Sequence, residues 1–291
     1  MISAPTLKTN GYPVASLGVG HSPPTVARYA VCGAVRPRLT EALWVGERAR
    51  LMLMGCSKAV SNDRNAAAVF SGKRVDGSPL DGAHQHAHFL CEAAQGDARI
   101  GHLTVYAPMG FSVEDERALS RLRRLWGQGG HDLQLVLLGV GQPEDFGGLN
   151  ERAGQGAILA ESRVWVSRTP VVLTRHLKVG RARDLVEREL ATREELARVV
   201  RLELARRPWL ARFAEEVAIE PRLGRSECGT MLGGQFTSWL KFRRERRDGN
   251  GRRAGSEGYG FRLVFPAAVR GPIALGYGCH FGLGTFVPVE S

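Results

Sequence analysis

Three histidines at alternate positions are the clearest chemical feature of this sequence: His84, His86 and His88. A fourth, His102, follows in the same region. Alternate side chains of a β-strand point to one face of the sheet, so a strand here would gather three imidazoles. The unperturbed pKa of histidine, about 6.5, suits proton transfer near neutral pH. We therefore treat this stretch as the candidate reactive site.

Three interpretations of these histidines are open. One of them could act as general acid or base in RNA cleavage, where the 2′-OH beside the scissile phosphate is the nucleophile. Three strand histidines could instead bind zinc, with Asp81 and Glu92 nearby in the sequence. The imidazoles could also be structural, stacking on RNA or bonding to backbone carbonyls. For a single histidine the structural interpretation is the simplest; for the group we favour at least one catalytic role.

The charge of the chain favours a polyanionic partner. Among 291 residues, 40 are Lys or Arg and 29 are Asp or Glu, which gives a net charge of +11 and a pI near 10.0. Such a balance indicates RNA or DNA rather than an acidic small molecule. Residues 241–253 hold seven basic and two acidic residues, and they are the best candidate for gripping a nucleic-acid backbone. A solvated, disordered loop is the alternative for this run.

The cysteines and the hydropathy indicate a cytoplasmic protein. No CxxC pair occurs, and an odd number of scattered cysteines fits reduced thiols better than a disulfide framework. No apolar run approaches membrane-spanning length, so we expect no membrane partner. The five cysteines are Cys32, Cys56, Cys91, Cys228 and Cys279.

Residues 25–140 carry the pattern of a first domain, after an irregular segment over residues 1–24. Alternation and helical spacing predict the order β-α-β-β-α-β, which is the ferredoxin-like pattern. A long polar loop over 55–83 interrupts it, and Thr40 is the expected N-cap of the first helix. The predicted strands cover 26–32, 84–90, 100–107 and 132–139, and the predicted helices cover 39–54 and 113–126.

The pattern then restarts. Residues 141–160 are rich in glycine and form the expected linker. Within 161–291 we expect a second ferredoxin-like domain, with strands over 164–174 and 258–265. Residues 182–206 should be helical in two pieces, the second starting at Thr192, whose spacing to Glu195 matches a capping box.

A glycine-rich stretch, GPIALGYGCHFGLGTFVP, covers residues 271–288. Such density of glycine needs close approach of the backbone to another backbone or to a ligand. Exposed N–H groups there could hold phosphate, although no GK[ST] follows as in a P-loop. A tight hairpin is the equally simple alternative. Phe281 and Phe286 could stack on bases or pack beneath the loop.

Four blocks in this order resemble the RAMP superfamily of CRISPR RNA-binding proteins and repeat-cleaving endoribonucleases. They are the glycine-rich stretch together with SGKRVDGSPLDGAHQHAHFL (71–90), RIGHLTVYAPMGF (99–111) and WVSRTPVVLTRH (165–176). The closest resemblance is to the C-terminal half of the fused RAMP protein of type I-U/I-G systems. Those proteins carry another RAMP half before this point, so we expect a truncated or split form.

The resemblance implies an α+β fold of tandem ferredoxin-like (RRM-like) domains with a C-terminal glycine-rich loop. It implies metal-independent, cofactor-free cleavage of CRISPR repeat RNA that leaves a 2′,3′-cyclic phosphate. The relatives' G-H-x-H-A pattern matches His84, His86 and Ala87, whereas their Asp-His pair is Gly101-His102 here. We expect His84 or His86 to be catalytic, with His102 as partner, and Tyr29, Lys58 or Lys73 as possible sources of the stabilising charge.

The resemblance also implies partners and contact residues. The partners are CRISPR repeat RNA and other subunits of a CRISPR effector complex. A non-catalytic crRNA-binding subunit of such a complex is the alternative function. The expected RNA-binding residues are Arg168, Arg175, Lys241, Arg243, Arg244, Arg246, Arg247, Arg252, Arg253, Gly276, Gly278, Gly282 and Gly284.

Overall fold

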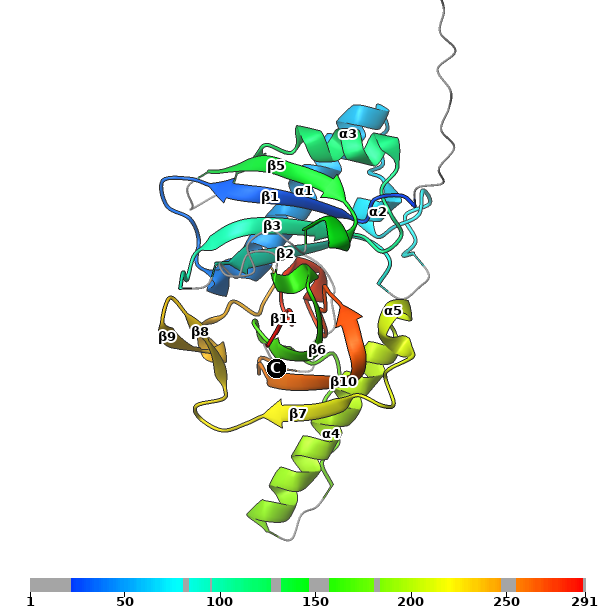
Figure 1. Cartoon of the computed structure of the whole chain (residues 1–291). Helices are drawn as coiled ribbons and strands as arrows, with labels where there is room; N and C mark the ends of the chain where they lie inside the picture. Colours follow the sequence, from blue (N-terminus) through cyan, green and yellow to red (C-terminus); the bar gives the residue numbers. More distant parts are fainter. Residues whose placement is uncertain are drawn as a thin grey trace, which may run out of the picture.

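The computed structural model describes residues 22–80, 84–94, 96–126, 132–146, 157–180, 184–246 and 255–289. Within these residues the chain is α+β, as predicted, with two antiparallel sheets of four or five strands and a separate two-stranded hairpin. Figure 1 shows the first sheet with α1 and α3 in the upper part of the molecule, and the second sheet with α4 in the lower part. No helix in the described part of the chain has the length and apolar character needed to cross a bilayer.

The first sheet is built from β1 to β5 in the spatial order β2-β3-β1-β5-β4. The predicted β-α-β-β-α-β order is confirmed, and β1 has the predicted bounds because its buried and polar residues alternate clearly. Helices α1 and α3 pack on each other and contribute to the core of this sheet. The elements are β1 Val26–Cys32, η1 Leu39–Glu41, α1 Ala42–Ser61, α2 Ala68–Ser71, β2 His88–Ala93, β3 Ile100–Tyr106, α3 Val113–Arg121, β4 Arg124–Leu125 and β5 Leu133–Gly141.

Three local predictions in this half were wrong. Helix α1 runs on to Ser61, and α2 occupies part of the expected long loop. Thr40 does not cap α1, because a 3-10 turn precedes the helix and Glu41 takes the N-cap position without a side-chain bond. Strand β2 begins only at His88, because His84 has a left-handed backbone (φ 55°) that no strand residue adopts.

The second sheet has the order β11-β6-β10-β7. Numbered along this half of the chain, that order matches β5-β1-β3-β2 of the first sheet. Helix α4 is continuous, not in two pieces: Asp184 caps it, and Thr192 bonds to the Arg188 carbonyl inside it. The elements are η2 Pro143–Phe146, η4 Ala157–Leu159, β6 Glu161–Ser167, α4 Leu185–Ala205, α5 Pro208–Ala211, β7 Ala218–Arg222, β8 Gly229–Leu232, β9 Gln235–Ser238, η5 Trp239–Lys241, β10 Gly260–Arg270, η6 Cys279–Phe281 and β11 Phe286–Pro288.

Residues 271–285, here called the glycine-rich segment, join the two halves. The segment is drawn in red between the two sheets in Figure 1, and its turn η6 contacts α1 and β2. Tyr277, Phe281 and Leu283 belong to the hydrophobic core of the first sheet, although the segment leads into β11 of the second. The two sheets are therefore connected through a shared apolar core. The expected linker over 141–160 falls partly outside the described residues.

Candidate functional site

Four imidazoles meet where the glycine-rich segment touches the start of β2. The ring of His280 lies at the centre: its centroid is 4.0 Å from that of His86 and 3.9 Å from that of His88, with interplanar angles of 4° and 26°. The ring of His84 stacks against it at 5.1 Å. His84, His86 and His88 thus come together as the sequence suggested, around a fourth histidine from far along the chain.

The gathering has a different cause from the expected shared face of a strand. Only His88 lies in β2, where it is buried. His84 and His86 precede the strand, and the chain turns back there, so that the His88 Nε2 lies 3.3 Å from the His84 carbonyl oxygen. The ring of His86 lies against Gly72, where a Cβ would come within 2.9 Å of it. The turn and this close contact place the rings.

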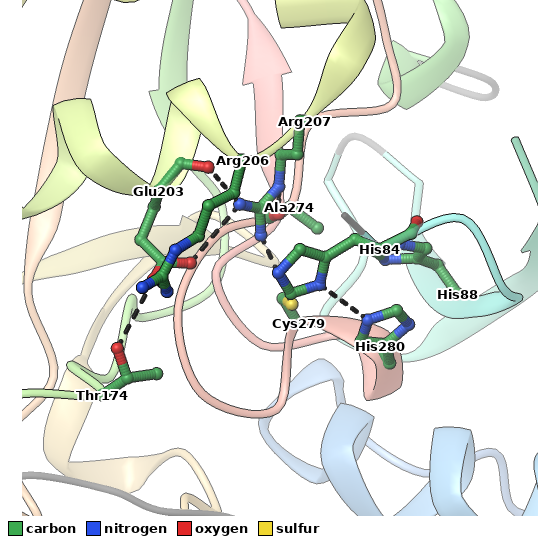
Figure 2. A network of polar contacts seen from close by, with 9 residues as sticks. All are labelled: His84, His88, Thr174, Glu203, Arg206, Arg207, Ala274, Cys279 and His280. Carbon is green, nitrogen blue, oxygen red and sulfur yellow. Dashed lines mark hydrogen bonds and ion pairs between the residues drawn. The ribbon is translucent and has the colours of Figure 1, made fainter. Parts of the chain in front are cut away.

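A chain of hydrogen bonds fixes the tautomers of two of these rings (Figure 2). The His280 Nδ1 lies 3.1 Å from the Ala87 carbonyl oxygen, and its Nε2 lies 2.8 Å from the His84 Nδ1. Because a carbonyl only accepts, the His280 Nδ1 donates, and the Nε2 of that neutral ring accepts from the His84 Nδ1. His84 is then left with a lone pair on Nε2. A half-buried imidazole with a defined acceptor nitrogen is suited to take up a proton.

A buried arginine borders the cluster on the side of the second half, as Figure 2 shows. Arg207 is fully buried and donates to the Ala274 carbonyl (2.9 Å), to the Glu203 carbonyl and to the Cys279 Sγ (3.5 Å). It also forms a buried ion pair with the Glu203 carboxylate at 3.3 Å. Glu203 pairs in addition with Arg206 at 2.9 Å. These bonds hold the guanidinium in one place beside the histidines.

Burial keeps the four imidazoles neutral. Burial, followed by the positive charge of Arg207, lowers the pKa of His84 to about 4. Burial and then Arg50 lower the pKa of His86 to about 4. The pKa values of His88 and His280 also lie well below the ordinary range, mainly because both rings are desolvated. At neutral pH the cluster therefore offers lone pairs and N–H donors rather than positive charge.

His102 lies apart from this cluster. It pairs with Glu92 in β2, whereas His88 pairs with Tyr106, four residues further along β3. Four residues of strand correspond to roughly 13 Å. Burial and then Arg28 lower the pKa of His102, while Glu92 acts in the opposite direction. The structure thus gives His102 charged neighbours in the first sheet instead of the other histidines.

The other proposed sources of charge are also accounted for. Tyr29 is buried and donates its hydroxyl to the Leu119 carbonyl, inside the first core. Lys58 is exposed in the last turn of α1. Lys73 is exposed and follows Gly72, the residue that contacts His86. Of the three, Lys73 is the one nearest in sequence to a contact of the cluster.

The candidate RNA-binding arginines are partly engaged within the protein. Arg168 donates to the Met231 carbonyl at 2.7 Å, and burial lowers its pKa. Arg243 and Arg246 pair with Glu41 at 3.6 Å and Glu47 at 2.6 Å, so they attach this basic run to α1. Arg175 and Lys241 are exposed, Arg244 is half-buried, and Arg247, Arg252 and Arg253 lie outside the described residues.

The four candidate glycines have left-handed backbones, with φ between 59° and 88°. A Cβ on Gly284 would lie 1.9 Å from the Leu275 carbonyl oxygen, and one on Gly276 would lie 2.5 Å from that of Val172. Gly276, Gly282 and Gly284 are buried and Gly278 is half-buried. Many amides of the segment donate within the protein: those of Leu275, Tyr277, Cys279, Phe281, Leu283, Gly284, Thr285 and Phe286. Backbone packing thus gives these glycines a role of their own, and Phe281 and Phe286 are buried with them.

Sequence reasoning missed His280, Cys279, Arg207 and Glu203. His280 and Cys279 stand inside the stretch that the sequence singled out for its glycines, which was the available signal. Arg207 follows a core helix and has no motif around it. Its role depends on Ala274 and Cys279, which are 67 and 72 residues away along the chain.

Comparisons with known proteins find similarity only among solved structures. No protein family model matches the chain, and no curated protein matches it. The chain is similar over 91% of its length to "An RAMP protein binding different RNA substrates" (12% identity, 98% of that chain, TM-score 0.37). It is similar over the same share to a Cas6 product complex (13%, 100%, 0.37) and to Csf5, a type IV Cas6 crRNA endonuclease (10%, 98%, 0.29). At these identities and TM-scores the similarities assign no function to the site.

Proposed function

We propose that this chain is a metal-independent endoribonuclease of the RAMP type that cleaves CRISPR repeat RNA. The proposal is supported by the four sequence blocks that resemble RAMP proteins, closest to the fused protein of type I-U/I-G systems, and by the net charge of +11. The two sheets with matching strand order are consistent with tandem ferredoxin-like domains. The other subunits of a CRISPR effector complex are the proposed protein partners.

The observation that carries the proposal is the hydrogen-bond chain from Ala87 through His280 to His84. It leaves the Nε2 of His84 as an acceptor, and we assign this atom as the general base. The base takes the proton of the 2′-OH, whose oxygen then attacks phosphorus. The O2′–P bond forms, the P–O5′ bond breaks, and the products are a 2′,3′-cyclic phosphate and a 5′-OH.

His86 is the proposed partner that protonates the leaving 5′-oxygen, because its ring lies in the same cluster. His102, the partner expected from the sequence, lies too far along β3 to share a scissile phosphate with His84. Among the candidate RNA contacts, Arg175 and Lys241 are exposed and available to bind phosphates. Negative charge on such phosphates also favours the protonated forms that the cluster adopts during the reaction.

The test is cleavage of the cognate repeat RNA in excess EDTA by the unmodified protein and by His84→Ala, His86→Ala and His102→Ala. We expect the His84 and His86 variants to lose at least about 100-fold in single-turnover rate, as for removal of a general acid or base, with RNA affinity retained. We expect His102→Ala to lose less. Binding of RNA without any cleavage by the unmodified protein would instead identify a non-catalytic crRNA-binding subunit.

A further inference from the structure

Three potential metal ligands meet inside the histidine cluster. One ligand atom each from His84, Cys279 and His280 can be chosen so that all three lie within 4.8 Å of one another. Cys279 and His280 lie side by side in η6, while His84 precedes β2. Two imidazoles and one thiolate are a donor set that suits zinc, which accepts nitrogen and sulfur ligands in tetrahedral geometry.

The surroundings of these ligands already have the form that metal sites require. A metal-bound histidine commonly donates its other ring N–H to a backbone carbonyl, as His280 does to Ala87. The Cys279 Sγ accepts a hydrogen bond from Arg207, which favours a thiolate. Glu203 pairs with Arg206 and Arg207 and offsets their charge next to a cation. Of the three ligands, His280 and Cys279 are therefore held by groups outside the ligand set.

We propose that His84, Cys279 and His280 bind a zinc ion and leave its fourth position open. The His280 ligand atom is Nε2, because Nδ1 is bonded to Ala87. The nearest nitrogen of His84 is Nδ1, at 2.8 Å from it. Nitrogen ligands of tetrahedral zinc lie about 3.3 Å apart, so the two rings need to separate by only about half an ångström.

The protons balance as follows. Zinc takes the place of the hydrogen between the His84 Nδ1 and the His280 Nε2, and that hydrogen is replaced by one on the Nε2 of His84. The Cys279 thiol loses its proton to solvent when the zinc–sulfur bond forms. No electrons are transferred. Zinc binding thus converts the His84 Nε2 from an acceptor into a donor, which would stop it from acting as a general base.

The test uses the full chain, freed of metal by a chelator, then dialysed and kept reduced. We expect one Zn²⁺ per chain in calorimetry and, with Co²⁺ as the probe, a thiolate-to-cobalt charge-transfer band. Cys279→Ser should abolish the band and weaken Zn²⁺ binding by at least about 100-fold, which is the upper end of the loss for a supporting residue. Cys228→Ser is the matched control and should behave as the unmodified chain.

Two results would overturn the proposal. The first is the absence of a charge-transfer band in the unmodified protein, and this result does not depend on any variant folding. The second is a band that persists in Cys279→Ser, which would place the ion at another thiol. Both readouts follow metal binding without RNA, so the proposal and the assigned ribonuclease activity fail independently. If both hold, Zn²⁺ will inhibit cleavage by the unmodified protein.

Discussion

The two halves of the molecule share a strand order but differ in what connects their last two strands. In the first half, β3 leads into α3, a regular helix that packs on α1. In the second half, β10 leads into the glycine-rich segment, which reaches out of its own sheet to α1 and β2. The helix stabilises one half, whereas the segment joins both halves and brings His280 to the other histidines. The difference indicates that the chemistry arose where regular structure was given up.

The largest effect is expected at Gly284. An alanine there would place Cβ 1.9 Å from the Leu275 carbonyl oxygen on a left-handed backbone (φ 59°), and we expect a loss of about 4 kcal/mol in the free energy of unfolding. Urea denaturation measures it. Gly77 is the matched control, because its φ is 82° but a Cβ would have no atom within 4 Å. Gly77→Ala should cost about 1 kcal/mol; equal losses would show that backbone conformation alone matters.

A comparable loss is expected from Arg207→Met, which leaves the buried Glu203 with one partner fewer. Breaking a buried pair in this way typically costs about 3–5 kcal/mol. Arg206→Met removes the other partner of the same carboxylate, but the Arg206 side chain is 43% exposed, so the cost should stay below about 1 kcal/mol. Thermal or urea unfolding of both variants decides. Similar losses for the two would contradict a special role for the arginine beside the cluster.

Two glycines of α1 should respond with opposite signs. A Cβ on Gly46 would lie 2.8 Å from the Cα and the carbonyl oxygen of Phe281, so Gly46→Ala should destabilise by about 2 kcal/mol through overpacking. Gly55, in the same helix, is exposed and has no atom within 4 Å of its added Cβ. Gly55→Ala should therefore stabilise by about 0.8 kcal/mol through helix propensity. If both variants stabilise, the segment does not press on this helix.

The smallest effect concerns the helix of the first half. Ser112 and Asp115 form a capping box at the start of α3, and Ser112→Ala should cost about 1 kcal/mol. Ser120→Ala, at an exposed position of the same helix, should change stability by less than about 0.5 kcal/mol. Because α3 does not reach the histidines, RNA cleavage by Ser112→Ala at a temperature where it is folded should equal that of the unmodified protein. A selective loss of cleavage would break the division of roles between helix and segment.

The sequence predicts the first sheet well, because its evidence is local. Alternation in Val26–Cys32 and the helical spacing after Leu39 reflect burial of one face, which any sequence window reveals. The core stripe of α4, with Leu196, Val199 and Leu204, is buried as expected for the same reason. Boundaries fail where one residue decides the backbone, as at His84 with its left-handed φ.

The candidate site is only half predictable, because its other half comes from contacts at long range. The spacing of His84, His86 and His88 announces the cluster. The ring that completes it, His280, is separated from His84 by 196 residues, and no periodicity connects them. The glycines of the segment were visible, but their positive φ values and close contacts serve packing as well as any ligand. Density of glycine indicates a special backbone without saying what the backbone approaches.

That same separation has a consequence for the birth of the protein on the ribosome. The first sheet can begin to form as soon as β5 has emerged, since domains generally fold in the order of synthesis. Until residues 277–283 follow, the surface that Tyr277, Phe281 and Leu283 cover stays open, and His84 has no His280 to donate to. A chain released early would therefore hold three of the four histidines and lack the assembled site. Reactivity is delayed until nearly all of the fold is in place, which protects cellular RNA from incomplete copies.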